Sequence, residues 1–139
     1  PEVQRASESV MSVKQDVKLL NEQVILYTVE KPLQHIVQKR SLLAEQVNYF
    51  LPHYSSQFFR NKVYAGMQRA GLDIPQARWF TNLATKGNTG SASIYIMLDE
   101  LFRSGAFLAG KKLQIGETVL CYIPESGRFS SAFMHLTVV

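Results

Sequence analysis

The most informative stretch of this 139-residue sequence is Lys86-Gly87-Asn88-Thr89-Gly90-Ser91-Ala92-Ser93. Asn, Thr and Gly are common turn formers, and apolar residues then follow at helical spacing, namely Ile94, Met97, Leu98 and Leu101. The pattern predicts a glycine-bracketed turn that leads into a helix closed by Gly105. Such a turn can hold the Asn88 side-chain amide rigidly as a hydrogen-bond donor, and an ordinary turn or cap residue is the alternative.

A second informative stretch lies about thirty residues upstream, at Val47-Asn48-Tyr49-Phe50-Leu51-Pro52-His53. Its apolar character predicts a short, mostly buried strand that ends at Pro52-His53. Strand ends are the places where α/β folds put their sites, which makes His53 a candidate functional residue. A histidine in an ordinary loop is the alternative.

The remaining elements follow from local patterns. Val13 to Val29 contains two β-like stretches separated by Asn21-Glu22-Gln23, which predicts a hairpin. Helical spacing predicts a helix from Pro32 to Leu43. A second helix, capped by Ser55-Ser56 and closed by Gly71, is expected to bury Phe59, Val63 and Met67.

Three further strands are expected: a short piece near Trp79-Phe80, then Thr118 to Ile123 and Phe129 to Val139. Strands that alternate with helices predict an α/β layer fold with a largely buried mixed sheet. Residues 1–12 are polar and unpatterned, so we expect a tail or linker there and one domain over residues 13–139.

The amino-acid composition indicates classes of binding partner but does not identify a single one. The net charge is +4 and the sequence pI is about 9.3, which favours anionic partners such as nucleic acid, anionic lipid, coenzyme A or an acidic carrier protein. An ordinary solvated protein surface would account for the same excess of positive charge. No nucleic-acid signature and no apolar run long enough for a membrane span is present. A single cysteine and the lack of a signal segment favour a cytoplasmic protein.

Other reactive side chains point to structural roles. Ser126 lies in Glu-Ser-Gly, which lacks the bracketing glycines of a hydrolase nucleophile turn. Cys121 lies inside an apolar strand and is expected to pack. His35 and His135 have no metal-ligand spacing to other His, Cys or acidic residues, so no metal site is expected.

The two stretches together resemble the C-terminal half of β-ketoacyl-acyl-carrier-protein synthase III, a thiolase-fold condensing enzyme. In that family a strand ends in Pro-His, and Gly-Asn-Thr-Ser/Gly-Ala-Ser follows some thirty residues later at a helix start. Downstream similarity includes Leu98-Asp99-Glu100, Arg103-Ser104-Gly105 and Gly116-Glu117. The resemblance runs from about Val17 to the C-terminus. It implies one half of a two-half fold, with a mixed sheet of the five-stranded type covered by helices.

The resemblance also implies a chemistry. His53 and Asn88 match the family's catalytic His and Asn, which hydrogen-bond the thioester carbonyl of the extender substrate. Decarboxylation places enolate charge on that oxygen, and fixed donors stabilise it. The substrates would be acyl-CoA or acyl-carrier-protein thioesters, with no further cofactor. The implied activity is an acyltransferase of fatty acid biosynthesis.

Three departures from the family pattern stand out. Gln-Ala-Asn after the histidine is here Tyr54-Ser55-Ser56, and the glycine-rich oxyanion loop is replaced by a segment that contains Glu125, Ser126 and Gly127. Both changes favour a divergent enzyme of secondary metabolism. No cysteine occupies the family's nucleophile position, so the resemblance implies that the chain is inactive without an N-terminal half.

The expected partners are that N-terminal half, a carrier protein or coenzyme A thioester, and a second copy in a homodimer. Arg60, Lys62 and Arg69 on the second helix are candidate contacts for the carrier protein or coenzyme A. Two alternatives stay open. One is a ketosynthase-like partner subunit, or an enzyme that forms an ester or amide bond, and the other is a pure binding module that uses the basic surface.

Overall fold

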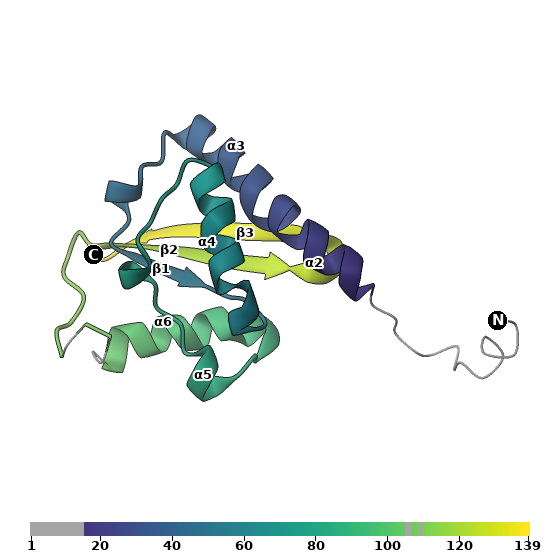
Figure 1. Cartoon of the computed structure of the whole chain (residues 1–139). Helices are drawn as coiled ribbons and strands as arrows, with labels where there is room; N and C mark the ends of the chain where they lie inside the picture. The colour runs from purple at the N-terminus through teal and green to yellow at the C-terminus, as the bar shows by residue number, and fades with distance from the viewer. Residues whose placement is uncertain (1–15, 105–106, 109) are drawn as a thin grey trace, which may run out of the picture.

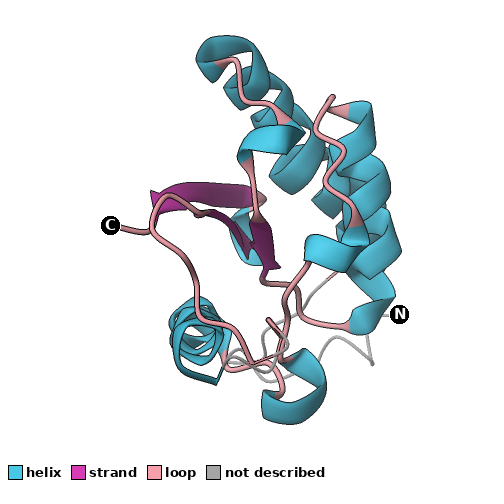
Figure 2. Ribbon diagram, turned by 90° about the vertical axis from the view of Figure 1, so that its left-hand side faces the viewer, coloured by secondary structure: helices cyan, strands magenta, loops and turns pink. Residues whose placement is uncertain are grey.

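The computed structural model describes residues 16–104, 107–108 and 110–139. Three layers are visible in Figure 1: a small sheet in the middle, helices α2, α3 and α4 over one face, and α6 over the other. Figure 2 shows the sheet between the two helical layers from the side. This arrangement confirms the predicted α/β layer fold.

The sheet has the order β1-β2-β3. Strand β1 (Tyr49–Pro52) pairs parallel with β2 (Thr118–Glu125), and β2 pairs antiparallel with β3 (Ser130–Thr137). The sheet is therefore mixed, as predicted, with three strands in the described residues where the resemblance implied the five-stranded type. The expected strand near Trp79-Phe80 is only an isolated parallel bridge between Trp79 and Phe50.

Successive side chains along the strands point to opposite faces of the sheet, and each face has its own hydrophobic core. Phe50, Leu120 and Tyr122 point to the face covered by α2, α3 and α4, where they join one buried cluster. Leu51, Val119 and Cys121 point to the opposite face and pack with the α6 residues Ile94, Met97 and Leu101. Because side chains alternate along a strand, the central strands are buried on both faces.

The predicted hairpin at the N-terminal end is wrong. The chain there forms α2 (Val17–Ile25), a π-helical turn η1 (Leu26–Glu30) and α3 (Lys31–Arg40) in succession. The β-branched residues that suggested strands also lie at helical spacing, and tertiary packing of the resulting face overrides their strand propensity. The buried residues of this face are Val24, Ile25, Thr28, Val29 and Leu33.

The π-helical turn has a local cause. Pro32 has no N–H to continue the helical ladder, and just before it the N–H of Lys31 bonds to the carbonyl of Leu26, five residues back. Thr28 in this turn donates its hydroxyl to the carbonyl of Val24 and contacts the Tyr122 hydroxyl at 2.7 Å. The predicted helix from Pro32 to Leu43 is thus confirmed as α3, which begins one residue earlier and ends at Arg40.

The helices predicted after Ser55-Ser56 and after the Asn88 turn are confirmed, whereas the short helix at Leu83–Lys86 was not predicted. Ser56 caps a short 3₁₀ turn, η3 (Gln57–Phe59), which continues into α4 (Arg60–Arg69). Gly71 ends that helix with φ of 87°, a conformation that favours glycine. Two short 3₁₀ turns, η4 (Gln76–Arg78) and η5 (Gly90–Ala92), flank α5 (Leu83–Lys86), and α6 spans Ser93–Ser104.

The last connections complete the fold. A 3₁₀ turn η2 (Ala44–Gln46) leads into β1, and η6 (Ser126–Arg128) joins β2 to β3. Gly105, the predicted end of the third helix, and the predicted tail at residues 1–12 lie outside the described residues.

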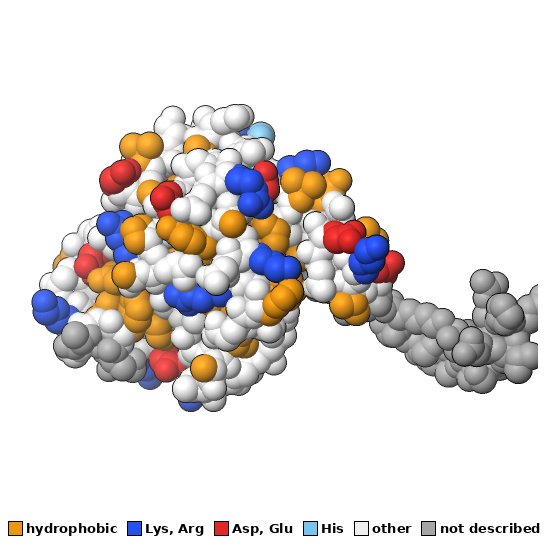
Figure 3. All heavy atoms as spheres, viewed as in Figure 1, with side chains coloured by type: hydrophobic (Ala, Val, Ile, Leu, Met, Phe, Trp, Pro, Cys, Tyr) orange, Lys and Arg blue, Asp and Glu red, His pale blue; other side chains and the backbone are white. Residues whose placement is uncertain are grey.

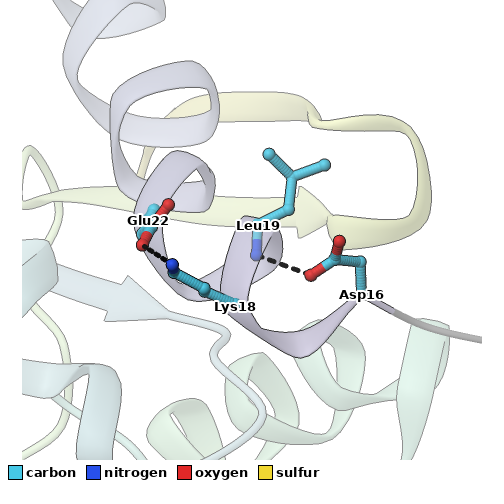
Figure 4. Close-up of polar contacts among 4 residues, drawn as sticks. All are labelled: Asp16, Lys18, Leu19 and Glu22. Atoms are coloured by element: carbon cyan, nitrogen blue, oxygen red, sulfur yellow. Dashed lines mark hydrogen bonds and ion pairs between the residues drawn. The ribbon is translucent and has the colours of Figure 1, made fainter.

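Replacing Asp16 with alanine is expected to destabilise the chain by about 1 kcal/mol, because Asp16 caps α2. Its carboxylate accepts a hydrogen bond from the N–H of Leu19 at 2.9 Å (Figure 4). Lys18→Ala is the matched control, because the Lys18–Glu22 pair spans 4.0 Å between exposed side chains. Urea denaturation compares the two variants, and equal losses of stability would contradict a capping role.

Candidate active site

His53 directly follows β1, at the carboxyl end of the parallel pair. Its backbone N–H donates to the carbonyl of Tyr122 on β2 at 2.9 Å. This hydrogen bond extends the β1–β2 ladder by one residue and fixes the backbone position of His53. The residue is half-buried. Burial lowers the pKa of His53 below its ordinary value, because removal from water disfavours the imidazolium. The neutral imidazole therefore has one N–H donor and one acceptor nitrogen.

Asn88 lies in the turn that precedes α6. Gly87 and Gly90 adopt φ of 72° and 63°, so the turn needs glycine at both positions. The side-chain oxygen of Asn88 accepts the N–H of Gly90 at 3.0 Å. Because the oxygen is committed to the backbone, the amide nitrogen points the other way. Among the described residues, Asn88 Nδ2 has no hydrogen-bond partner, which leaves a donor for a ligand.

Ser93, the first residue of α6, stabilises this turn from behind. Its buried hydroxyl accepts the backbone N–H of Thr89 at 3.1 Å and pairs with the Thr89 hydroxyl at 2.8 Å. The residue next to Asn88 is thereby tied to the helix. This confirms the predicted glycine-bracketed turn and shows that its serine has a defined structural role.

One cavity of about 420 Å³ brings His53 and Asn88 together. Its remaining wall is mainly apolar and comes from α2, η3, α4 and β2, with Leu20, Val24, Ile25, Phe59, Val63 and Tyr122 among its residues. Glu125 is the one charged side chain on the wall formed by the described residues. Concave, largely apolar sites with a few convergent polar groups are typical ligand sites.

The segment proposed as an oxyanion loop is arranged differently from a free glycine-rich loop. Glu125 lines the cavity, whereas Gly127 is exposed and donates its N–H to Glu125 Oε1 at 3.0 Å. The Gly127 N–H is therefore already occupied within the turn. A substrate oxygen could accept it only after the carboxylate of Glu125 moves away. The structure does not describe the side chain of Ser126.

The three basic residues of α4 have different surroundings. Arg60 donates to Gln76 Oε1 at 2.7 Å and lies over the ring of Trp79, while Lys62 lies over the exposed ring of Phe58 and Arg69 pairs with Glu30 at 2.9 Å. Figure 3 shows Lys and Arg side chains spread singly over this face, with acidic and hydrophobic ones between them. A carrier contact through these residues stays a prediction.

The structure places Cys121 in the core and the two other histidines on the surface. Cys121 is fully buried between the sheet and α6, and burial raises the pKa of its thiol to about 12. A thiol in that state is not a nucleophile at neutral pH. His35 is exposed on α3, and His135 lies on β3. The described residues contain no cluster of His, Cys, Asp or Glu that could hold a metal ion.

The sequence patterns missed the α2 wall of the cavity. Leu20, Val24 and Ile25 belong to the segment predicted as a hairpin, so their common face was not recognised. The spacing of Leu20 and Val24, four residues apart, was the available signal. Tyr122 was missed as well, because a tyrosine inside an apolar strand gives no sign that it contacts a cavity.

Comparison with known proteins identifies the family. The sequence model described as 3-oxoacyl-(acyl-carrier-protein) synthase III C terminal matches residues 37–121, more than half of the chain. The chain belongs to this family. The match includes the strand end at His53, the turn at Asn88 and all of α6.

Curated relatives agree with the synthase III assignment. The β-ketoacyl-(acyl-carrier-protein) synthase III of Prochlorococcus marinus is 33% identical over 97 residues, which is 68% of this chain and 27% of the relative. The synthase III of Synechococcus sp. is 33% identical over 81 residues, or 58% of this chain and 23% of the relative. The chain thus spans about a quarter of the length of these relatives.

A solved structure gives the same fold. The 3-oxoacyl-(acyl carrier protein) synthase III of Pseudomonas aeruginosa superposes with a TM-score of 0.66 at 20% identity, covering 95% of this chain and 38% of that one. The thiolase-like synthase III fold is therefore confirmed well beyond the part of the chain matched by sequence. Within the residues that the structure describes, no helix has the length and apolarity that a membrane crossing requires.

Proposed function

We propose that this chain is the C-terminal half of a synthase III-type acyltransferase and supplies the His53–Asn88 pair for decarboxylative condensation of acyl thioesters. The observation that carries the proposal is the single cavity lined by both side chains. Asn88 Nδ2 is a free donor among the described residues, and a neutral His53 has one N–H to offer. Two such donors can stabilise the enolate oxygen that forms when a malonyl thioester loses carbon dioxide.

The reaction needs groups from outside this chain. Covalent acyl transfer requires an accessible thiolate, and Cys121 is buried with a raised pKa. We therefore propose that an N-terminal half carries the nucleophilic cysteine and that the chain alone is inactive. Acyl-CoA or acyl-carrier-protein thioesters are the proposed substrates, since the relatives are named as acyl-carrier-protein synthases.

The outer surface of α6 is the proposed contact surface for the N-terminal half. Tyr95 is 69% exposed and Phe102 is 48% exposed, and seven positions along a helix place them on one side. An apolar surface that is left exposed on one side of a helix can be covered by another part of a protein. We propose that the N-terminal half packs here, and that the complete protein forms a homodimer.

A divergent role is the second candidate. Glu125 lines the cavity, and its carboxylate occupies the N–H of Gly127. A partner subunit without condensing activity would not need that N–H, whereas an enzyme that forms an ester or amide bond would need it free to stabilise the tetrahedral intermediate. Detection of an acyl-cysteine on the complete protein by intact mass, followed by identification of the product, separates this role from condensation.

Asn88→Asp in the complete protein is expected to lower the decarboxylation rate of a malonyl thioester about 10- to 100-fold. The aspartate keeps the oxygen that accepts the Gly90 N–H and replaces the donor nitrogen with a charged oxygen. Release of labelled carbon dioxide measures the rate. Asn61→Asp is the matched control, because Asn61 lies exposed on α4 away from the cavity. Decarboxylation as fast as in the control would contradict the proposed donor.

A further inference from the structure

A second, much smaller cleft adjoins His53. It has a volume of about 10 Å³, and His53, Thr81 and Asn82 are among its lining residues. That volume is close to the minimum of about 10–15 Å³ that one water molecule needs. Because His53 also lines the 420 Å³ cavity, the same residue borders a substrate-sized space and a water-sized one.

The cleft offers water the partners it requires. Asn82 is only 8% exposed, and its Nδ2 donates to Glu100 Oε2 at 2.7 Å. Among the described residues, no protein group donates to Asn82 Oδ1, and this oxygen is not fully enclosed by protein, so a water molecule can reach it. Thr81 Oγ1 accepts the N–H of Leu83 at 3.3 Å, so its hydroxyl hydrogen can still donate. The Asn82 oxygen, the Thr81 hydroxyl and His53, which also lines the cleft, make three candidate partners, a typical number for a buried water.

We propose that one ordered water molecule binds in this cleft and fixes the tautomer of His53. The water accepts a hydrogen bond from the Thr81 hydroxyl and donates one hydrogen to Asn82 Oδ1. Its second hydrogen goes to the imidazole nitrogen on the cleft side. This inference rests on the proposed function, because it concerns which way the donor of His53 points.

The consequence is a defined direction for the N–H of His53. A neutral imidazole has one protonated nitrogen, and the hydrogen bond made by the other nitrogen sets which one it is. With the cleft-side nitrogen accepting from water, the proton lies on the other nitrogen. The N–H is then available to a carbonyl oxygen in the large cavity, as the nitrogen of Asn88 is. Thr81 and Asn82 are positioning residues in this account, since they act through the water.

The test is the nitrogen-15 NMR spectrum of the histidine rings in the 139-residue chain, recorded at a pH where His53 is neutral. The expected result is one dominant His53 tautomer in the wild-type chain and a tautomer mixture in Asn82→Ala. Glu100→Ala is the matched control, because it removes the other partner of Asn82 without lining the cleft. It should keep the wild-type tautomer.

If Asn82→Ala does not fold, Thr81→Val tests the water site independently, because valine removes the hydroxyl. Thr81→Ser is its control, because serine keeps a hydroxyl at the same position. A mixture in Thr81→Val and a single tautomer in Thr81→Ser support the water site. A tautomer mixture in the wild-type chain, or the same spectrum in all variants, would overturn it. The measurement uses no substrate, so its failure would leave the proposed role of His53 in decarboxylation to be decided by rates.

Discussion

Replacing His53 with alanine in the complete protein is expected to slow decarboxylation of a malonyl thioester roughly 100- to 1,000-fold. The variant loses one of the two donors in the cavity, and the remaining donor, Asn88 Nδ2, stabilises the enolate oxygen less well alone. Release of labelled carbon dioxide measures the rate. Formation of the acyl-cysteine, followed by intact mass, should be nearly unchanged because that step needs the thiolate instead.

The control for this substitution is His135→Ala, which removes a histidine from β3 outside the cavity. It should leave both steps near their wild-type rates. Two results would count against the assigned role: full decarboxylation by His53→Ala, or an equal loss in acyl transfer and decarboxylation. The second result would point to a general loss of structure.

Phe50→Ala is expected to destabilise the chain by about 3–5 kcal/mol, because it truncates a fully buried aromatic side chain. Phe50 is fully buried at the centre of β1, between β2 and the Trp79 bridge. Its ring meets Trp79 edge-on, with the ring centroids 4.8 Å apart. Truncation removes this contact and leaves a cavity in the larger core, three residues before His53.

Urea denaturation, followed by the fluorescence of Trp79, measures the effect of Phe50→Ala. Phe102→Ala is the matched control, since Phe102 is 48% exposed on α6 and should change stability by no more than about 0.5 kcal/mol. Similar losses in the two variants would show that the core around β1 is not packed as described.

Much of the fold and of the candidate site could be predicted from the sequence, because two short motifs constrain them. The turn at Asn88 needs glycine on both sides, and the strand before His53 is buried on both faces, so each motif has one good structural solution. The resemblance implied that His53 and Asn88 meet, but the spacing of the two motifs alone does not. Their meeting depends on the packing of α6, which follows Asn88, against β1, which precedes His53.

The wrong prediction of a hairpin at the N-terminal end also has a physical cause. The segment from Val17 to Val29 is rich in β-branched residues, and local propensity favoured strands. Its real conformation is decided by burial of Val24, Ile25 and Val29 and by the hydrogen bond between Thr28 and Tyr122, a contact between distant parts of the sequence. The same holds for Glu125, whose bond to the Gly127 N–H cannot be inferred from residue types.

The most direct test of the central claim is whether a thioester carbonyl reaches the nitrogen of Asn88. Acetyl-CoA and its thioether analogue S-ethyl-CoA differ at this point only in the carbonyl oxygen. Each is titrated into the nitrogen-15-labelled 139-residue chain, and the side-chain amide signal of Asn88 is followed by NMR. We expect a shift of that signal with the thioester and little change with the thioether. Equal shifts with both compounds, or no shift with either, would contradict it.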